Sequence, residues 1–222
     1  MSAFRAVIFD MDGVLLDSEP FHHAALNEVL AADGRSVSDE EYRPFIGSGE
    51  IRWEDLVRRF DLVGSPGGYC RQFDDAVTRQ YRARSRLNPG AAELLAGLRE
   101  AAVPLGVASN SKRRWVDAAI ETLGIGGRFL SVVAADEVTK PKPAPDLYLA
   151  VAAGLGVPPA ECIAVEDSLP GVQSARAAGT YVVGYRTPHT TGLDLPADEV
   201  IDTLYEFPLD RLAVDVALRK AG

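Results

Sequence analysis

Residues 6–13 read Ala6-Val7-Ile8-Phe9-Asp10-Met11-Asp12-Gly13, and this stretch sets the architecture that the rest of the sequence extends. The short apolar run ends abruptly in polar residues, which is typical of a strand buried on both faces of a sheet. Two carboxylates directly after such a strand are costly unless a cation or a proton compensates them. The stretch therefore predicts a buried strand with a charged site at its carboxyl end.

Similar apolar runs recur downstream and alternate with helical patterns. The further predicted strands are 104–108, 131–134, 162–165, 181–185 and, last, 199–201. Apolar residues at helical spacing lie between them, over 91–98, 116–123 and 147–155, and Pro170 and Gly179 flank another helix. Strands alternating with helices indicate an α/β fold, a Rossmann-like parallel sheet with helices on both faces. Functional residues are then expected at the carboxyl ends of the strands.

Residues 17–86 break this alternation. They contain several helical stripes and no convincing strand, and Ser38 followed by three acidic residues resembles a helix start. We interpret the segment as an α-helical insertion that caps the working edge of the sheet. The predicted domains are a catalytic core of residues 1–16 and 87–222 and a helical cap of residues 17–86.

Composition excludes several classes of protein. The chain has 222 residues, 47% of them hydrophobic, and a net charge of −9, so a basic face for nucleic acid is not expected. The sequence has neither a signal-peptide pattern nor an apolar run of membrane-spanning length, and we expect a cytoplasmic protein. Cys70 and Cys162 lie in unlike contexts and are expected to be reduced thiols.

Four polar groups stand where predicted strands end or where the chain is stiffened by prolines. They are, in chain order, Asp10 with Asp12, Ser109 with Asn110, Lys142, and Glu166 with Asp167. Each has an ordinary alternative: an acidic turn or a calcium-binding loop, helix N-caps, an exposed lysine in a proline-rich loop, and another N-cap region. Together they fit one chemistry, in which carboxylates hold Mg²⁺ and the lysine, a serine and backbone amides surround a phosphoryl group.

The order of these motifs resembles the haloacid dehalogenase superfamily over nearly the whole chain. The matching stretches are 10–18, 107–110, 142–146 and 166–171. The insertion after the first motif is similar to the cap of the branch that contains β-phosphoglucomutase, phosphoglycolate phosphatase and sugar-phosphate phosphatases.

The resemblance implies a role for each matching residue. Asp10 is the expected nucleophile, which becomes an aspartyl phosphate, and Asp12 the expected general acid and base. The expected Mg²⁺ ligands are Asp10, Asp167 and the backbone carbonyl of Asp12. Glu166 is expected to bind the ion directly or through water. Lys142 and Ser109 are expected to stabilise the transferring group. The remaining candidates for phosphate or substrate binding are Met11, Gly13, Asn110 and, from the cap, His22, Gly47, Ser48 and Glu50.

Branches of the superfamily differ at positions that this sequence lets us compare. Dehalogenases lack an acid at the position of Asp12, and phosphonatases use a cap lysine, whereas residues 17–86 contain no lysine. β-Phosphoglucomutase shares His22, but its two basic cap residues fall at Glu50 and Val77 here. We therefore expect a Mg²⁺-dependent phosphatase of a small phosphorylated metabolite, either a sugar phosphate or a phosphoglycolate-like ester. We expect it to act as a monomer or weak homodimer. A mutase and a non-catalytic binding protein stay as alternatives.

Overall fold

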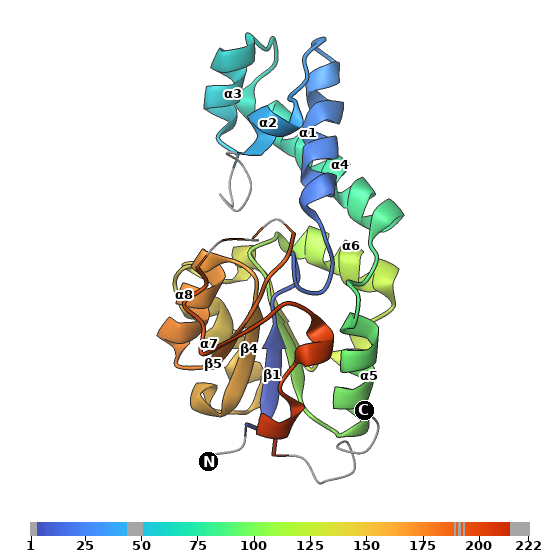
Figure 1. The fold of residues 1–222 in the computed structure, drawn as a ribbon. Coiled ribbons are helices and arrows are strands. Elements are labelled where there is room, and N and C mark those ends of the chain that lie inside the picture. Colours follow the sequence, from blue (N-terminus) through green and yellow to red (C-terminus); the bar gives the residue numbers. More distant parts are fainter. Residues whose placement is uncertain (1–3, 44–50, 189, 191, 193, 214–222) are drawn as a thin grey trace.

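A single sheet of six parallel strands organises the structure, a computed structural model that describes residues 4–43, 51–188, 190, 192 and 194–213. Its strand order is β3-β2-β1-β4-β5-β6, and Figure 1 labels β1, β4 and β5 of this sheet. The strands are β1 Ala6–Phe9, β2 Leu105–Ala108, β3 Ser131–Val133, β4 Cys162–Glu166, β5 Tyr181–Tyr185 and β6 Glu199–Ile201. The predicted α/β fold is confirmed. From β1 the chain adds β2 and β3 on one side, and it then adds β4, β5 and β6 on the other side, so the order of strands reverses between β1 and β4.

Helices cover both faces of the sheet. The α-helices are α1 Glu19–Ala31, α2 Asp39–Tyr42, α3 Trp53–Phe60, α4 Pro66–Arg84, α5 Ala91–Glu100, α6 Arg113–Leu123, α7 Asp146–Leu155 and α8 Leu169–Ala178. Short 3-10 helices are η2 Gly126–Arg128, η3 Ala135–Glu137, η4 Pro159–Glu161, η5 Leu204–Glu206 and η6 Leu209–Arg211. Side chains alternate along β1, so that Val7 and Phe9 pack with α5 and α6, while Ala6 and Ile8 pack with α7 and α8.

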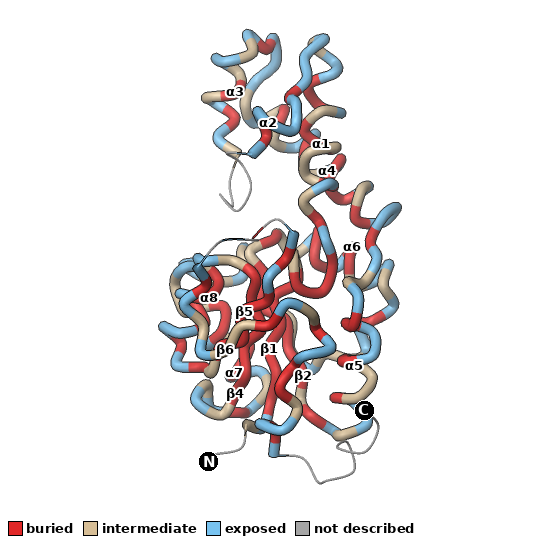
Figure 2. The backbone as a smooth tube through the Cα atoms, viewed as in Figure 1, coloured by how far each residue is buried: buried red, intermediate tan, exposed pale blue. Residues whose placement is uncertain are grey.

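Burial follows the position of each strand in the sheet. Strands β1, β2 and β4 are buried throughout (Figure 2). Strand β3, at the edge of the sheet, is only partly buried. The edge strand is also one residue shorter than predicted, because pairing with β2 ends at Val133. The buried central strands bring β1 and β4 side by side in register, with Phe9 opposite Val165. The residues that follow these two strands therefore meet at one edge.

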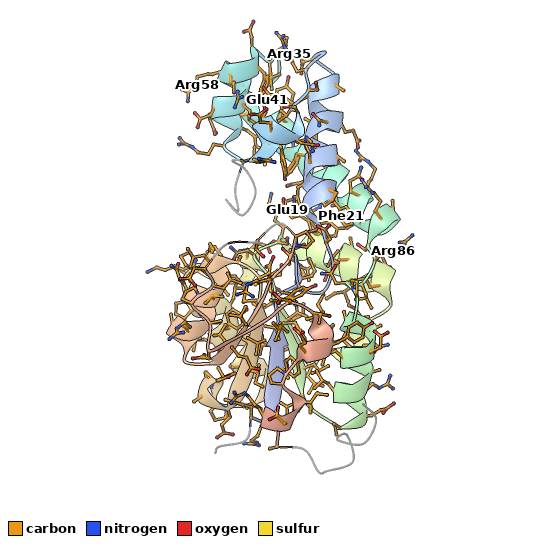
Figure 3. The ribbon with its side chains drawn as sticks, viewed as in Figure 1. Glu19, Phe21, Arg35, Glu41, Arg58 and Arg86 are labelled. Carbon is orange, nitrogen blue, oxygen red and sulfur yellow. The ribbon has the colours of Figure 1, made fainter. Side chains whose placement is uncertain are left out.

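Helices α1–α4 form a separate layer beyond the carboxyl ends of the strands (Figure 1). We call these four helices the cap. The chain enters and leaves it through adjacent segments, where the side-chain amide of Asn88 donates to the carbonyl oxygens of Gly13 and Val14 at 2.7 and 2.9 Å. Glu19 and Phe21 lie at the end of the cap nearest the sheet, and Arg35 lies at its far end (Figure 3).

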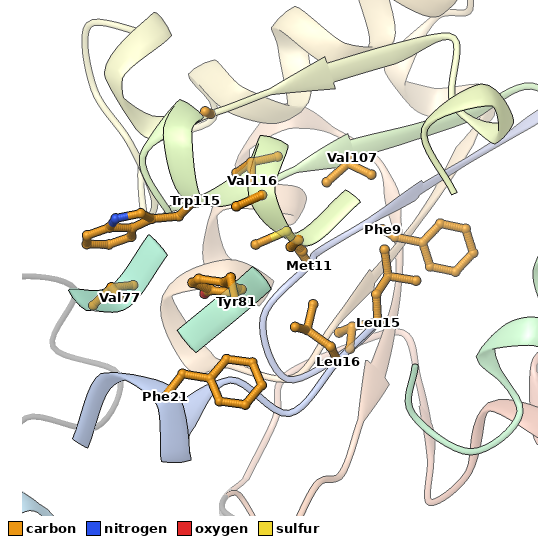
Figure 4. Packing of buried hydrophobic residues seen from close by; sticks show 14 of the residues in the cluster. Phe9, Met11, Leu15, Leu16, Phe21, Val77, Tyr81, Val107, Trp115 and Val116 are labelled. Atoms are coloured by element: carbon orange, nitrogen blue, oxygen red, sulfur yellow. The ribbon is translucent and has the colours of Figure 1, made fainter. Parts of the chain in front are cut away.

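Cap and core share one apolar cluster where they meet. Phe21 and Tyr81 of the cap pack in the same cluster as Met11, Leu16 and Trp115 of the core (Figure 4). The ring of Tyr81 meets that of Phe21 edge-on, with centroids 5.4 Å apart. These contacts lie beside the predicted domain boundaries, which stay a prediction. Within the part of the chain that the structure describes, each helix is too short or too polar to span a bilayer.

Candidate active site

The site lies at the carboxyl ends of three neighbouring strands. Asp10 directly follows β1, Ser109 follows β2, and Glu166 ends β4 with Asp167 after it. This edge is where the strand order changes direction, and open parallel sheets bind their ligands at such a point. Residues separated by more than 150 positions in the sequence are thus brought to one place.

Lys142 lies between two of the carboxylates. Its Nζ is 2.8 Å from Asp10 Oδ1 and 2.6 Å from Glu166 Oε1, and all three side chains are buried. Burial opposes the charge of Lys142, but the carboxylates of Asp10 and Glu166 overcome this effect and raise the pKa of the ammonium. Lys142 is therefore a fixed positive charge beside Asp10.

Asp10, Glu166 and Asp167 also fit a metal ion. One oxygen from each lies within 4.8 Å of the others, and oxygen atoms are the ligands that Mg²⁺ prefers. The pKa of Asp10 is raised to about 8: burial raises it most, Lys142 opposes this rise, and the charges of Glu166 and Asp12 add to it. Burial followed by repulsion from Asp10 and Glu166 raises the pKa of Asp167 well above its usual range. A bound cation would favour the ionised forms of both carboxylates and so lower their pKa values.

Gly13 allows Asp167 to come this close. Its φ is +86°, in the left-handed region, and a Cβ added there would lie only 2.0 Å from Asp167 Oδ2. The Gly13 N–H donates to the carbonyl oxygen of Leu16 at 2.8 Å and so helps to close the turn after β1, while the role of Gly13 in phosphate binding stays a prediction. Met11, the neighbouring candidate, buries its side chain in the apolar cluster (Figure 4).

Asp12 is held by hydroxyl groups from the core and the cap. Tyr81 of α4 donates to its Oδ1 at 2.5 Å, and Ser111 and Ser109 donate to its Oδ2 at 2.7 and 3.3 Å. Burial and the charge of Asp12 raise the pKa of Tyr81, so the phenol remains protonated and donates. The predicted acid–base residue is thus linked directly to a cap helix.

The other predicted residues fall into three groups. The side-chain amide of Asn110 accepts from the N–H of Lys142 at 2.9 Å and donates to its carbonyl oxygen at 3.4 Å, so it fixes the lysine backbone. His22 lies between the rings of Tyr81 and Trp115, with its Nε2 3.3 Å from the Tyr81 hydroxyl. Burial lowers the pKa of His22, against the opposing effect of Asp12. Gly47, Ser48 and Glu50 lie outside the described residues.

Comparison with known proteins identifies the family. The family model for haloacid dehalogenase-like hydrolases matches residues 4–179, which span β1 to the end of α8. The chain belongs to the haloacid dehalogenase-like hydrolases. The resemblance seen in the four motifs is therefore confirmed.

Relatives of this hydrolase include proteins with sugar phosphates in their names. The protein CbbY of Rhodobacter capsulatus is 37% identical, with 87% of this chain and 90% of the relative covered. The N-acetylmuramic acid 6-phosphate phosphatase of Pseudomonas aeruginosa is 31% identical, with 95% and 94% covered. A crystal structure of mutant CbbY from Rhodobacter sphaeroides with xylulose-(1,5)bisphosphate is 27% identical, with 94% and 99% covered and a TM-score of 0.81. These relatives confirm the predicted enzyme class, a phosphatase-type hydrolase.

Three hydroxyl-bearing residues of the hydrolase site were missed by the sequence analysis. Ser111 and Tyr81 contact Asp12, and Tyr148 of α7 donates to Glu166 Oε1 at 2.6 Å. Ser111 follows a motif that was already recognised, so its position was the available signal. Tyr81 and Tyr148 lie among apolar residues of helical stripes, where a tyrosine is usually part of the core.

Proposed function

We propose that this chain is a Mg²⁺-dependent phosphatase that hydrolyses a phosphorylated sugar through an aspartyl phosphate on Asp10. The observation that carries the proposal is the convergence of Asp10, Lys142, Glu166 and Asp167 at one edge of the sheet. A buried carboxylate with a fixed ammonium 2.8 Å away has the arrangement that phosphoryl transfer requires, a nucleophile beside a positive charge.

The reaction proceeds in two displacements. An oxygen of Asp10 bonds to phosphorus while the bond from phosphorus to the ester oxygen breaks, and Asp12 gives that oxygen a proton. Water then attacks the phosphorus and passes a proton to Asp12. The bond between phosphorus and the Asp10 oxygen breaks, so inorganic phosphate is released and Asp10 is restored. Lys142 and Ser109 stabilise the charge of the transferring group throughout.

Asp10, Glu166, Asp167 and the backbone carbonyl of Asp12 would hold the ion. When bound, Mg²⁺ supplies positive charge that neutralises the nucleophile and the phosphoryl oxygens. The hydroxyl groups of Tyr81 and Ser111 orient Asp12 at the cap side of the site, and for proton transfer the ester oxygen must replace one of these donors.

A sugar phosphate is supported as the substrate by relatives whose names specify such compounds, including the phosphatase of N-acetylmuramic acid 6-phosphate. Hydrolysis is favoured over mutase action by Val77. This residue is fully buried in the apolar cluster, so a basic group for a second phosphate has no counterpart at that position.

The first test is hydrolysis of p-nitrophenyl phosphate with Mg²⁺, followed by phosphorylated sugars scored by phosphate release. Asp10→Asn should lower kcat by at least about a thousandfold, because the nucleophile is lost. Equal rates of hydrolysis by the unaltered protein and by Asp10→Asn would favour a non-catalytic binding protein. With β-glucose 1-phosphate and a bisphosphate primer, glucose 6-phosphate that forms faster than free phosphate would establish the mutase instead.

A further inference from the structure

Tyr148 carries a buried hydroxyl that the proposed mechanism does not use. It lies in the first turn of α7, and its side chain is fully buried with Leu147, Val151 and Ala152 against the sheet. The neighbouring side chains of that face are apolar, so phenylalanine would satisfy the packing equally well. The hydroxyl is therefore the part of this residue that needs a separate explanation.

That hydroxyl is one of two short donors to the carboxylate of Glu166. Oε1 of Glu166 accepts from Tyr148 at 2.6 Å and lies 2.6 Å from Lys142 Nζ, while Ser168 donates to Oε2 at 3.4 Å. Glu166 is fully buried, and a buried carboxylate with too few donors is strongly destabilised. The Tyr148 hydroxyl therefore supplies one of the few hydrogen bonds that this carboxylate accepts.

The orientation of Glu166 decides where Lys142 points. Lysine is a compact charge on a flexible four-carbon stem, and it needs a fixed partner to hold one position. Glu166 provides that partner on one side of Nζ, and Asp10 lies on the other. The helix α8 encloses Glu166 from behind, since a Cβ added at Gly171 would lie 1.9 Å from Glu166 Oε2. Tyr148 completes this enclosure.

We propose that Tyr148 is a positioning residue, whose hydroxyl holds Glu166 so that the ammonium of Lys142 faces Asp10 and the phosphoryl group. The inference rests on the proposed function, because it assigns Tyr148 a part in phosphoryl transfer. Tyr148 touches none of the reacting atoms and acts only through Glu166. The ring has a second contact with Lys142, whose Nζ is 5.4 Å from its centroid, and phenylalanine would keep that contact.

Tyr148→Phe removes the hydroxyl and leaves the ring. The matched control is Tyr181→Phe, which removes a hydroxyl that donates to Glu199 at 3.0 Å near the opposite, amino end of the sheet. We expect Tyr148→Phe to lower kcat for p-nitrophenyl phosphate by about tenfold to a hundredfold, as for other residues that orient a catalytic group, with KM changed less than about threefold. Tyr181→Phe should stay within about twofold of the unaltered protein, and urea unfolding should show both variants folded.

A second measurement, NMR of the lysine ammonium groups, reports on the surroundings of Lys142 without any substrate or catalysis. The chain contains four lysines, so ¹⁵N-lysine labelling gives few ammonium signals, and Lys142→Arg identifies the one from residue 142. The protons of this buried, paired ammonium should exchange slowly with water. Tyr148→Phe should shift that signal or broaden it through faster exchange, and Tyr181→Phe should leave it unchanged.

The two measurements separate the inference from the function on which it rests. An unchanged Lys142 signal in Tyr148→Phe, or a kcat within about threefold of the unaltered protein, would overturn the role of Tyr148. If the unaltered protein shows no hydrolysis that depends on Asp10, the proposed function has failed instead. In that case the ammonium signal alone decides whether Tyr148 positions Lys142.

Discussion

Replacement of Gly13 by alanine should disrupt the proposed metal site while it leaves the fold in place. The added Cβ would lie 2.0 Å from Oδ2 and 2.5 Å from Cγ of Asp167, which is far inside any contact that real Cβ atoms make. The obstacle is the side-chain carboxylate of Asp167, one of the three proposed metal ligands. Asp167 must therefore leave its position in Gly13→Ala.

Gly179→Ala provides the matched control. Gly179 has a φ of +85°, almost the same as the +86° of Gly13, but its added Cβ would have nothing within 4 Å. Both variants place a Cβ in the left-handed region, which costs roughly 1–2 kcal/mol. The free energy of unfolding should fall by this amount in both variants, so any further difference between them reports the displacement of Asp167.

The size of the catalytic effect follows from the distance. To reach an ordinary contact of 3.4 Å from the Cβ, Asp167 Oδ2 must move by roughly 1.4 Å. A misplacement of about 1 Å in a catalytic group can cost about a hundredfold in rate. We expect Gly13→Ala to lower kcat/KM for p-nitrophenyl phosphate at least about a hundredfold relative to Gly179→Ala, and to require more Mg²⁺ for half-maximal activity.

The assay is a Mg²⁺ titration of hydrolysis, with urea unfolding of the same two variants. Gly13→Ala with activity within about threefold of Gly179→Ala would refute the reasoning, since a displaced Asp167 would then be irrelevant to turnover. A loss of stability in Gly13→Ala alone, with full activity in the folded fraction, would place the effect on folding and contradict the assignment of Asp167 to the metal.

Three further predictions concern the cap, the metal-free site and the cap–core contact. Tyr81→Phe removes a 2.5 Å hydrogen bond to Asp12 and should lower the free energy of unfolding by about 1–2 kcal/mol in urea; unchanged stability would contradict a strong bond. The pKa of Asp10 is raised to about 8, chiefly by burial, so the free energy of unfolding without metal should fall as pH rises from about 4 to 8. In urea unfolding, Mg²⁺ should therefore stabilise the protein more near pH 8 than near pH 5. Equal Mg²⁺ stabilisation at both pH values would contradict this. Asp74→Asn removes a pair in which Lys112 Nζ lies 2.7 and 2.8 Å from the two carboxylate oxygens; a double-mutant cycle with Lys112→Met should give a coupling of about 1 kcal/mol that shrinks in high salt, and no coupling would show the pair to be inert.

Much of the fold could be predicted because buried parallel strands have a simple pattern. The run from Ala6 to Phe9 and the run from Cys162 to Val165 are continuous apolar stretches that end in acids, and the structure pairs them in register. That pairing is what brings Asp10 and Asp167 to one edge. In each of these strands the change from apolar to acidic residues marks the carboxyl end. Once the strand order is known, the position of these acidic residues in the sheet follows.

The contacts between cap and core could not be predicted in the same way. Tyr81 reaches Asp12 only because α4 packs beside α6, and the angle of that packing depends on apolar side chains from both parts of the chain. A tyrosine in an amphipathic helix gives no signal for the carboxylate that it will meet. The same holds for Asn110, whose short side chain could cap a helix or hold Lys142, and the structure has it hold Lys142.

The electrostatics of the site support the proposed divalent cation. Among the described residues, Asp10, Glu166 and Asp167 bring three carboxylates around one ammonium, that of Lys142. Full ionisation would leave about two negative charges uncompensated in a buried place, which is too costly to persist. The raised pKa values of Asp10 and Asp167 have this cause, burial first and then repulsion between the carboxylates. The proposed Mg²⁺ would offset the same excess of negative charge and leave Asp10 ionised, so in the proposed mechanism metal binding would also prepare Asp10 to attack phosphorus.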